Sequence, residues 1–266
     1  MRDKRHTGTG GVEVLAVAGL PEFGPGDEIG AEIAARAELR DGDVVVVSQK
    51  VVSKVEGRIR RLAEVTPGPE ARRLAAELDK EPALVELILA ESRAVLRAER
   101  GVLIVETGHG FVCANAGIDT SNLPEPDTAS LLPEDPDASA RRIRSEFQFT
   151  PARGSEEPEG AGAAPAVIVS DSFGRAWRLG QAEVAIGCAG IDPLDDWRGR
   201  ADAEGRQLEA TLIAVADQAA AAADLVRDKA SRVPAAIVRG LDRHVTPADG
   251  PGAAALRRPP GEDLFR

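Results

Sequence analysis

Aromatic residues are scarce in this sequence, at 3% of 266 residues, and tyrosine is absent. A core must therefore be built from Val, Ile, Leu and Ala, which the 43% hydrophobic content supplies. Long apolar runs are also lacking. No segment approaches the roughly 18 residues that a membrane-spanning helix needs, and the first ten residues, MRDKRHTGTG, contain no apolar stretch typical of a signal peptide. We expect a globular, cytoplasmic protein that does not enter a membrane, with one large or two small domains.

Cysteine and histidine are too few and too scattered for a zinc site. The cysteines are Cys113 and Cys188, and the histidines are His6, His109 and His244. None of them shows the C-x-x-C or H-x-x-x-H spacing of metal ligands. Both cysteines lie in apolar, strand-like segments, which predicts small buried side chains.

Positive charge is in deficit, because 33 Lys and Arg face 44 Asp and Glu and the formal net charge is −11. A protein that binds nucleic acid without sequence preference needs a basic face for the phosphates, so we expect no nucleic-acid partner. The balance still permits an enzyme that binds nucleotides, because such a site needs only a local basic pocket and often a divalent cation.

Several common catalytic signatures are absent. The sequence has no G-x-x-x-x-G-K-[ST] loop, no G-x-G-x-x-G that follows a strand, and no G-x-S-x-G. Neither cysteine has an evident histidine partner. Covalent nucleophilic catalysis and P-loop nucleotide binding are therefore disfavoured.

The hydrophobic pattern predicts strands and helices that do not alternate regularly. Strands are expected at 12–17, within 41–54, at 167–170, 183–191 and 235–240, and residues 94–122 are expected to form a β-meander with a turn at 107–110. Helices are expected after a capping Asp27, at 70–92 with a break near Pro82, at 138–148 and at 212–229. This mixture predicts an α+β fold with irregular mixed sheets and flanking helices, not a doubly wound fold.

The chain reads as one domain over residues 12–245. The segment PARGSEEPEGAGAAP, residues 151–165, has the composition of a linker and predicts a mobile insertion. Residues 1–11 and the Pro- and Gly-rich residues 246–266 are expected to be loose ends.

Two polar loops each place an aspartate directly after an apolar segment. CANAGIDTSN contains Asp119, and VIVSDSFGR contains Asp171 and Ser172 just past a strand expected to end at Ser170. Mg²⁺ or Mn²⁺ takes carboxylates, a hydroxyl and waters, with phosphates completing the shell, so these residues form a candidate metal site. An ordinary Asx-turn explains each loop equally well by pattern alone, and both interpretations remain open.

Basic and aromatic residues beside these loops have the same two interpretations. Arg175 and Arg178 are able to hold carboxylate or phosphate by paired hydrogen bonds, but exposed arginines are commonly only solvated. Lys54 is placed either to reach a phosphate or to face water. Trp177 and Trp197 fit a core or a pocket wall better than a stacking platform.

Taken together, six motifs resemble the coenzyme F-420-0:L-glutamate ligase family, the γ-glutamyl ligases of deazaflavin coenzyme biosynthesis. The resemblance spans about residues 12–242. Its motifs, in chain order, are GLPEFGPGDEI, DGDVVVVSQKVVSKVEGR, CANAGIDTSN, SDSFGRAWRLGQAEVAIGCAG, DWRGRAD and VPAAIVRGL.

The resemblance implies a GTP-dependent ligase that adds L-glutamate to the terminal carboxylate of coenzyme F-420-0 and then further γ-linked glutamates. It also implies Mg²⁺ or Mn²⁺, two ions per subunit, stimulation by K⁺, and a non-P-loop ligase fold that forms an intertwined homodimer. An acyl phosphate made from the γ-phosphate of GTP would activate the carboxylate, which needs positioning and charge neutralisation more than covalent help.

By motif match, Asp119 and Asp171 would be metal ligands, and the hydroxyl of Ser172 would reach a second metal. Arg175 and Arg178 are the candidate catalytic anion holders. The GTP site would be lined by Leu20, Pro21, Glu22, Phe23, Gln49, Lys54 and Asn122.

Two positions depart from the family pattern. Gln49 stands where a serine is common, and Lys229 stands where some members carry an acidic metal ligand, with Asp228 beside it. Two alternatives are therefore carried forward: a related nucleotide-dependent carboxylate–amine ligase with another substrate, and a non-catalytic nucleotide-binding module.

Overall fold

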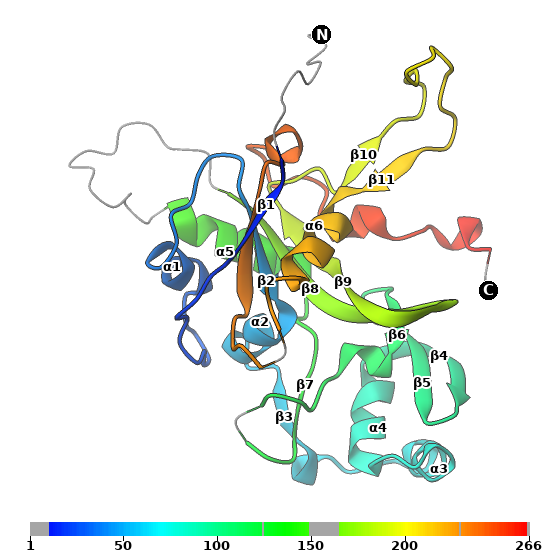
Figure 1. Cartoon of the computed structure of the whole chain (residues 1–266). Helices are drawn as coiled ribbons and strands as arrows, with labels where there is room; N and C mark the ends of the chain where they lie inside the picture. The colour runs from blue at the N-terminus through cyan, green and yellow to red at the C-terminus, as the bar shows by residue number, and fades with distance from the viewer. Residues whose placement is uncertain (1–10, 124, 149–164, 229, 265–266) are drawn as a thin grey trace.

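A five-stranded mixed sheet forms the centre of the molecule (Figure 1). The structure is a computed structural model that describes residues 11–123, 125–148, 165–228 and 230–264. The strand order is β1-β12-β2-β8-β9, and only β2 and β8 run parallel. The strands are β1 Glu13–Ala16, β2 Val44–Ser48, β8 Ala166–Arg175, β9 Arg178–Ala189 and β12 Ala235–Arg239. The expected insertion lies, except for Pro165, outside the described residues.

Helices cover both faces of this sheet, which explains why the VVVV run of β2 is fully buried. Side chains alternate between the faces, so Val45 and Val47 belong to one core and Val44 and Val46 to the other. The first core packs against α1 Ile29–Ala34, α2 Gln49–Val55 and α5 Pro136–Gln148, and the second packs against α6 Val215–Asp224.

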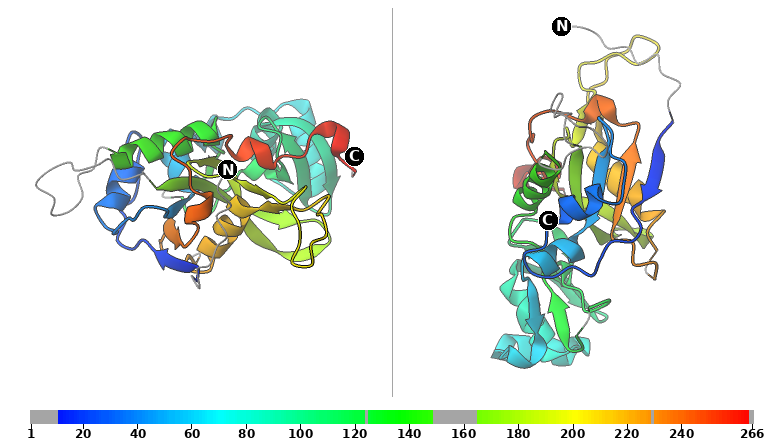
Figure 2. Two further views of the ribbon diagram at one scale, coloured as in Figure 1. Left: turned by 90° about the horizontal axis from the view of Figure 1, so that it is seen from above. Right: turned by 90° about the vertical axis from the view of Figure 1, so that its left-hand side faces the viewer.

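A smaller unit with its own core forms one end of the elongated molecule (Figure 2). It contains two helices, α3 Pro69–Leu78 and α4 Pro82–Ala90, and a three-stranded antiparallel sheet of β4 Ser92–Glu99, β5 Val102–Thr107 and β6 Val112–Ala114. Each helix begins with a proline, which has no N–H to leave unpaired in a first turn. The short pair β3 Ile59–Arg61 and β7 Thr128–Ser130 joins this unit to the central sheet.

The remaining elements lie at the periphery. An arm projects beyond the antiparallel pair β10 Leu194–Asp196 and β11 Leu212–Ala214 (Figure 1). The short 3₁₀ turns are Leu62–Glu64, Asn115–Gly117, Asp242–His244, Ala253–Leu256 and Pro260–Glu262. Among the described residues, no helix has both the length and the apolar character to cross a membrane.

The α+β prediction is confirmed, and so are the helix break at Pro82, the β-meander within 94–122 and the helix at 138–148. Three local expectations are wrong. The strand that was expected to end at Ser170 continues to Arg175, because β9 pairs with it along that length. Residues 49–55 form α2 instead of an extended polar exit, and α6 starts only at Val215 because residues 212–214 pair with β10.

A further local expectation, that Asp27 caps the first helix, is also wrong. Its Oδ2 accepts a hydrogen bond from the Gly24 N–H at 2.8 Å, so Asp27 closes the turn before α1. The residue at the N-cap is Glu28, which makes no capping side-chain hydrogen bond.

Part of the C-terminal segment makes specific contacts with the rest of the chain. Asp137 on α5 accepts from the Ala253 N–H at 2.7 Å and from the Cys188 N–H at 2.8 Å. Arg144 donates to Asp249 at 2.8 Å and to the carbonyl oxygen of Thr246 at 2.9 Å. The composition alone predicts that residues 246–253 are loose, but Thr246, Asp249 and Ala253 are hydrogen-bonded to side chains of α5.

Candidate active site

Several polar segments open at one edge of the central sheet, where the parallel pair β2–β8 ends. The last paired residues are Ser48 and Ser170, and beyond them β8 pairs only with β9. The loop before β12 reaches the same edge, because the Ser48 N–H donates to Pro234 O at 2.8 Å. The segment after β1 does so as well, because the Val17 N–H donates to Ala235 O at 3.0 Å. In open sheets, ligands bind at the carboxyl ends of parallel strands.

Asp119 is fixed at this edge by a lysine from the first turn of α2. Lys50 Nζ lies 2.8 Å from Asp119 Oδ2 and 2.8 Å from Ser121 O. Ser121 also donates to Asp119 through its backbone N–H at 2.7 Å and its hydroxyl at 3.0 Å. Burial by itself raises the pKa of Asp119, but the hydrogen bonds from Lys50 and Ser121 outweigh it and hold this pKa below its usual value. Asp119 is therefore a charged carboxylate at neutral pH.

Asp171 lies on β8 between Val169 and Phe173, which both pack in the core on the α2 side of the sheet. Strand alternation therefore directs its side chain to the side from which Asp119 and Lys50 act on it. Burial, and next the negative charge of Glu183, raise the pKa of Asp171 to about 7. Asp119 adds a smaller contribution of the same sign. The predicted pair of aspartates thus lies close enough for their charges to interact.

Ser172 faces the opposite side of the hairpin, toward a buried ion pair. Its hydroxyl lies 2.5 Å from Oε1 of Glu183, its cross-strand partner on β9. Arg227 Nη2 lies 3.2 Å from both Glu183 Oε2 and Ser170 Oγ. Arg227 and Glu183 are both buried, and no described residue accepts a hydrogen bond from Arg227 Nε. Adjacent positions of one strand therefore serve two different polar clusters.

The residues predicted to line a GTP site lie at the same edge but differ in exposure. Lys54 pairs with Glu22, and Leu20 is partly buried while Pro21 is exposed. Asn122 is exposed, with a left-handed φ of 53°.

Two residues that were predicted to line the GTP site already make contacts inside the protein. Phe23 is buried in the core, and Gln49 is buried with its Oε1 2.9 Å from Ser53 Oγ. The assignment of all seven residues to GTP stays a prediction.

Arg175 and Arg178 lie together at the tip of the β8–β9 hairpin, where they are register partners. Both are exposed, and Arg175 Nη2 donates to Leu179 O at 3.0 Å. Arg175 follows Asp171 by four strand residues, or roughly 13 Å. The hairpin therefore separates the two arginines from the carboxylates of this chain, and their catalytic role stays a prediction.

Sequence reasoning missed two charged residues of this site, Lys50 and Glu183. Lys50 belongs to a segment predicted to be the polar end of a strand. The spacing of Val51, Val52 and Val55, which are buried on one face of α2, also fits a helix. Glu183 becomes visible only once β9 is registered against β8, because it then faces Ser172. Both cysteines are buried as predicted, and burial raises the pKa of each thiol to about 12, which excludes a ready thiolate.

The donor chemistry of the edge suits a hard divalent cation, which prefers carboxylate and hydroxyl oxygens. Burial and the negative charges of Glu183 and Asp119 together raise the pKa of Asp171. Within the described part of the chain, however, no three acidic, histidine or cysteine side chains converge closely enough to form a complete metal site. Nucleotide phosphates and water would have to supply the other ligands. Lys229 lies outside the described residues, and Asp228 Oδ1 accepts from the Ala230 N–H at 2.8 Å.

Comparison with known proteins gives a consistent family assignment. Residues 19–240 match the model of the F420-0:Gamma-glutamyl ligase family. The chain is 43% identical over 262 residues to the coenzyme F420:L-glutamate ligase of Methanothermobacter thermautotrophicus, covering 96% of this chain and 99% of that protein. It is 40% identical to the ligase of the same name from Methanopyrus kandleri, covering 97% and 100%. The corresponding values for the Haloarcula marismortui ligase are 42%, 96% and 96%.

These matches extend over nearly the whole of each chain and include the loops that carry Asp119 and Asp171. The chain therefore belongs to the F420-0:gamma-glutamyl ligase family.

Proposed function

We propose that this protein is a ligase that joins the amino group of L-glutamate to the terminal carboxylate of coenzyme F-420-0 and then adds further γ-linked glutamates. The observation that carries the proposal is the acidic edge of Asp119 and Asp171 beside Lys50, at the carboxyl end of the parallel strands. The relatives, named coenzyme F420:L-glutamate ligases, support the same substrates.

A carboxylate does not form an amide directly, because its oxygen is a poor leaving group. We propose that the γ-phosphoryl group of GTP passes to a carboxylate oxygen of the acceptor, which releases GDP and gives an acyl phosphate. The glutamate amine then attacks the acyl carbon, phosphate leaves, and the nitrogen loses a proton. Such transfers depend on alignment and on charge neutralisation of phosphate oxygens.

The described residues suit these tasks. Asp119 and Asp171 would hold one Mg²⁺ or Mn²⁺, and Ser172, on the other side of β8, would reach a second ion; when bound, these two ions per subunit would neutralise phosphate charge. K⁺ is proposed as a further activating ion. Lys50 and Lys54 place two positive charges on the helix that follows β2, at the edge where phosphates would bind. Both already pair with carboxylates, Asp119 and Glu22, so nucleotide binding would rearrange existing ion pairs.

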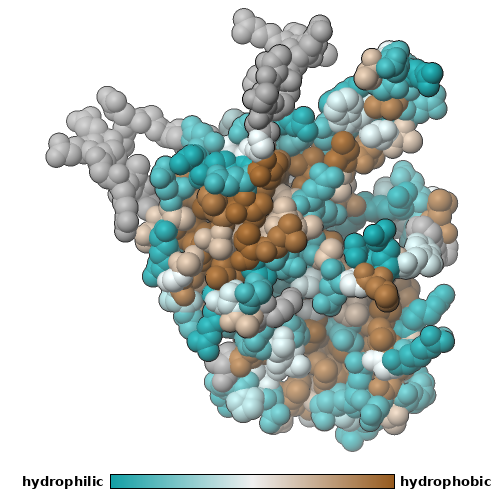
Figure 3. All heavy atoms as spheres, viewed as in Figure 1, coloured by the Kyte–Doolittle hydropathy of each residue, from teal (hydrophilic) through white to brown (hydrophobic). Residues whose placement is uncertain are grey.

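A homodimer is proposed as the working assembly. The hairpin tip exposes 83% of Trp177 and 98% of Leu179, an unusual exposure for large apolar side chains. Apolar side chains also gather near β1 and α6 in Figure 3. Val12, just before β1, and Leu225, just after α6, are both exposed. A second subunit that covers the tip would bring Arg175 and Arg178 into a protein environment and give them anions to bind.

The direct test is product formation. We expect the protein, incubated with GTP, Mn²⁺, L-glutamate and F-420-0, to yield species heavier by one or more glutamyl residues in mass spectrometry. Asp119→Asn and Asp171→Asn should each remove the product, whereas Asp41→Asn, an exposed position outside the edge, should not. Full activity in both site variants would contradict the metal assignment, and GTP turnover only with another carboxylic acid would identify a different ligase.

A further inference from the structure

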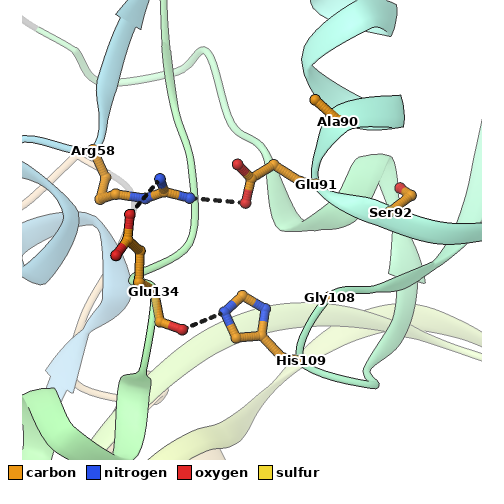
Figure 4. A pocket seen from close by; sticks show the side chains of 7 residues that line it. All are labelled: Arg58, Ala90, Glu91, Ser92, Gly108, His109 and Glu134. Atoms are coloured by element: carbon orange, nitrogen blue, oxygen red, sulfur yellow. Dashed lines mark hydrogen bonds and ion pairs between the residues drawn. The ribbon is translucent and has the colours of Figure 1, made fainter.

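Two adjoining cavities lie between the small unit and the start of α5, apart from the acidic edge. The first, of about 320 Å³, is lined by Arg58, Glu91, Ser92, His109 and Glu134, together with the backbone around Gly108 (Figure 4). The second, of about 260 Å³, shares His109 and Glu134 with the first and adds Arg93, Phe111 and Arg257. The two cavities therefore meet at His109.

The first cavity has an excess of negative charge. Arg58 donates to Glu91 at 2.8 Å, to Glu134 at 3.3 Å and to the carbonyl oxygen of Leu132 at 3.0 Å. One buried guanidinium thus faces two carboxylates, and the three groups together carry one net negative charge. Such a wall favours a cation, such as an ammonium group.

The second cavity has two guanidinium groups on one side. Both flank Gly110, where an added β-carbon would lie 3.4 Å from Arg257 Nη1 and 3.9 Å from Arg93 Nη1. Arg257 lies over the Phe111 ring at 5.9 Å from the centroid and donates to His109 O. Within the described part of the chain, Arg93 makes no hydrogen bond or ion pair, so its charge is available to a ligand.

The second cavity also has three carboxylates in its lining, Glu134, Asp135 and Asp137. Asp137 accepts from two backbone N–H groups, and Asp135 Oδ1 accepts from the Ala138 N–H at 2.9 Å. The lining of the second cavity as a whole is therefore also acidic, and only its side near Gly110, where both guanidinium groups lie, offers donors to an anion.

His109 is oriented by two carbonyl groups. Its Nε2 lies 2.8 Å from Pro133 O and 3.1 Å from Glu134 O, and because carbonyl oxygens only accept, Nε2 must be the donor. Nδ1 is buried and has no partner among the described residues. The ring edge that carries both nitrogens faces the space between Arg58, Glu91 and Ser92 (Figure 4). A ligand N–H would supply the missing donor to Nδ1.

The cavities are connected to the acidic edge through one short segment. Phe111 contacts Phe173 edge to face at 6.1 Å, and Phe173 is two residues beyond Asp171 on the same side of β8. Cys113, two residues beyond Phe111, is near enough to Asp171 for that carboxylate to raise its pKa. Two strand residues span about 7 Å, so Phe173 links the second cavity to Asp171 at the acidic edge.

We propose that these cavities are the binding site of the incoming amino acid, L-glutamate, an inference that rests on the proposed ligase function. Its ammonium group binds at Glu91, Glu134 and His109 in the first cavity, and its carboxylates bind Arg93 and Arg257 in the second. A zwitterion with two carboxylates matches this division of charge, whereas GTP and the coenzyme acceptor carry no ammonium group.

Steady-state kinetics of Arg93→Ala tests this assignment, because Arg93 is exposed and its replacement leaves no ion pair broken. We expect the KM for L-glutamate to rise about tenfold or more, the size of a lost charge-assisted hydrogen bond. The KM values for GTP and F-420-0 should not change. Arg97→Ala on the same strand is the matched control, because Arg97 lines neither cavity. An unchanged KM for L-glutamate, or a rise only in the KM for F-420-0, overturns the proposal.

A binding experiment separates this inference from the proposed function. Saturation-transfer NMR with L-glutamate should show contact with the wild-type protein, a weaker signal with Arg93→Ala and with Glu91→Gln, and no signal for glutarate, which lacks the ammonium group. Binding of this kind without any ligated product would retain the site and refute the ligase function. Product formation with equal L-glutamate binding by wild type and both variants would refute the site.

Discussion

At the residue scale, the site depends on the alternation of side chains along β8, where neighbouring residues face opposite sides of the strand. Asp171 and Ser172 were predicted as neighbours in one loop, but they lie on a strand and face opposite sides of it. The family motifs led to Asp171 and Asp119, and the two carboxylates lie close enough for their charges to interact, while their role as metal ligands stays a prediction. The sequence was not sufficient to find Lys50 or Glu183, whose roles depend on the start of α2 and on the register of β9.

The pKa of Asp171 leads to a prediction about stability. Its pKa is raised from 3.8 to about 7 in the folded protein, so the folded state binds this proton more tightly than the unfolded chain does. The free energy of unfolding of the metal-free wild type should therefore fall as pH rises from about 4 to about 7 and stay lower above that. Asparagine carries no charge at any pH, so Asp171→Asn should not lose stability in this way. We expect this variant to be more stable than wild type at pH 8 by about 2 kcal/mol.

Urea denaturation at pH 5 and pH 8 in the presence of a chelator measures this difference. Asp41→Asn, which removes a charge outside the acidic edge, is the control. If the free energy of unfolding had the same pH dependence in Asp171→Asn and in wild type, the pKa of Asp171 would not be raised in the folded protein.

At the element scale, apolar periodicity predicted the elements whose identity burial decides, such as β2, β12 and α5. It failed for the outer half of the β8–β9 hairpin, because residues 171–175 are held by pairing with β9 and not by a buried face. It also failed for α2, where β-branched valines favour a strand locally but tertiary packing produces a helix.

Substitution of Gly187 in β9 tests how closely this strand packs against the start of α5. A β-carbon at Gly187 would lie 2.2 Å from the carbonyl oxygen of Pro136, at the start of α5, whereas one at Gly174 would meet nothing within 4 Å. We expect Gly187→Ala to lower the free energy of unfolding by about 2 kcal/mol or more and Gly174→Ala to change it by less than about 0.5 kcal/mol. Calorimetric unfolding of the two variants checks this, and equal stabilities would contradict the close approach of α5 and β9.

At the scale of the whole molecule, the fold brings four distant segments to one edge of the sheet. These are the segments after β1, after β2 and before β12, and the outer part of β8. The sequence order alone does not reveal this convergence, because it depends on β12 being inserted between β1 and β2. The hairpin carries Arg175 and Arg178 away from that edge, so their proposed role depends on the proposed homodimer.

The central claim is that Asp119 and Asp171 form a cation site that works with nucleotide phosphates. The most direct measurement is calorimetric titration of Mn²⁺ into the protein in the presence of GDP, for wild type, Asp171→Asn and the control Asp41→Asn. We expect wild type and the control to bind alike, and Asp171→Asn to lose about a hundredfold in affinity or more, since it removes a charged oxygen ligand. Equal Mn²⁺ affinity in wild type and Asp171→Asn would contradict the account.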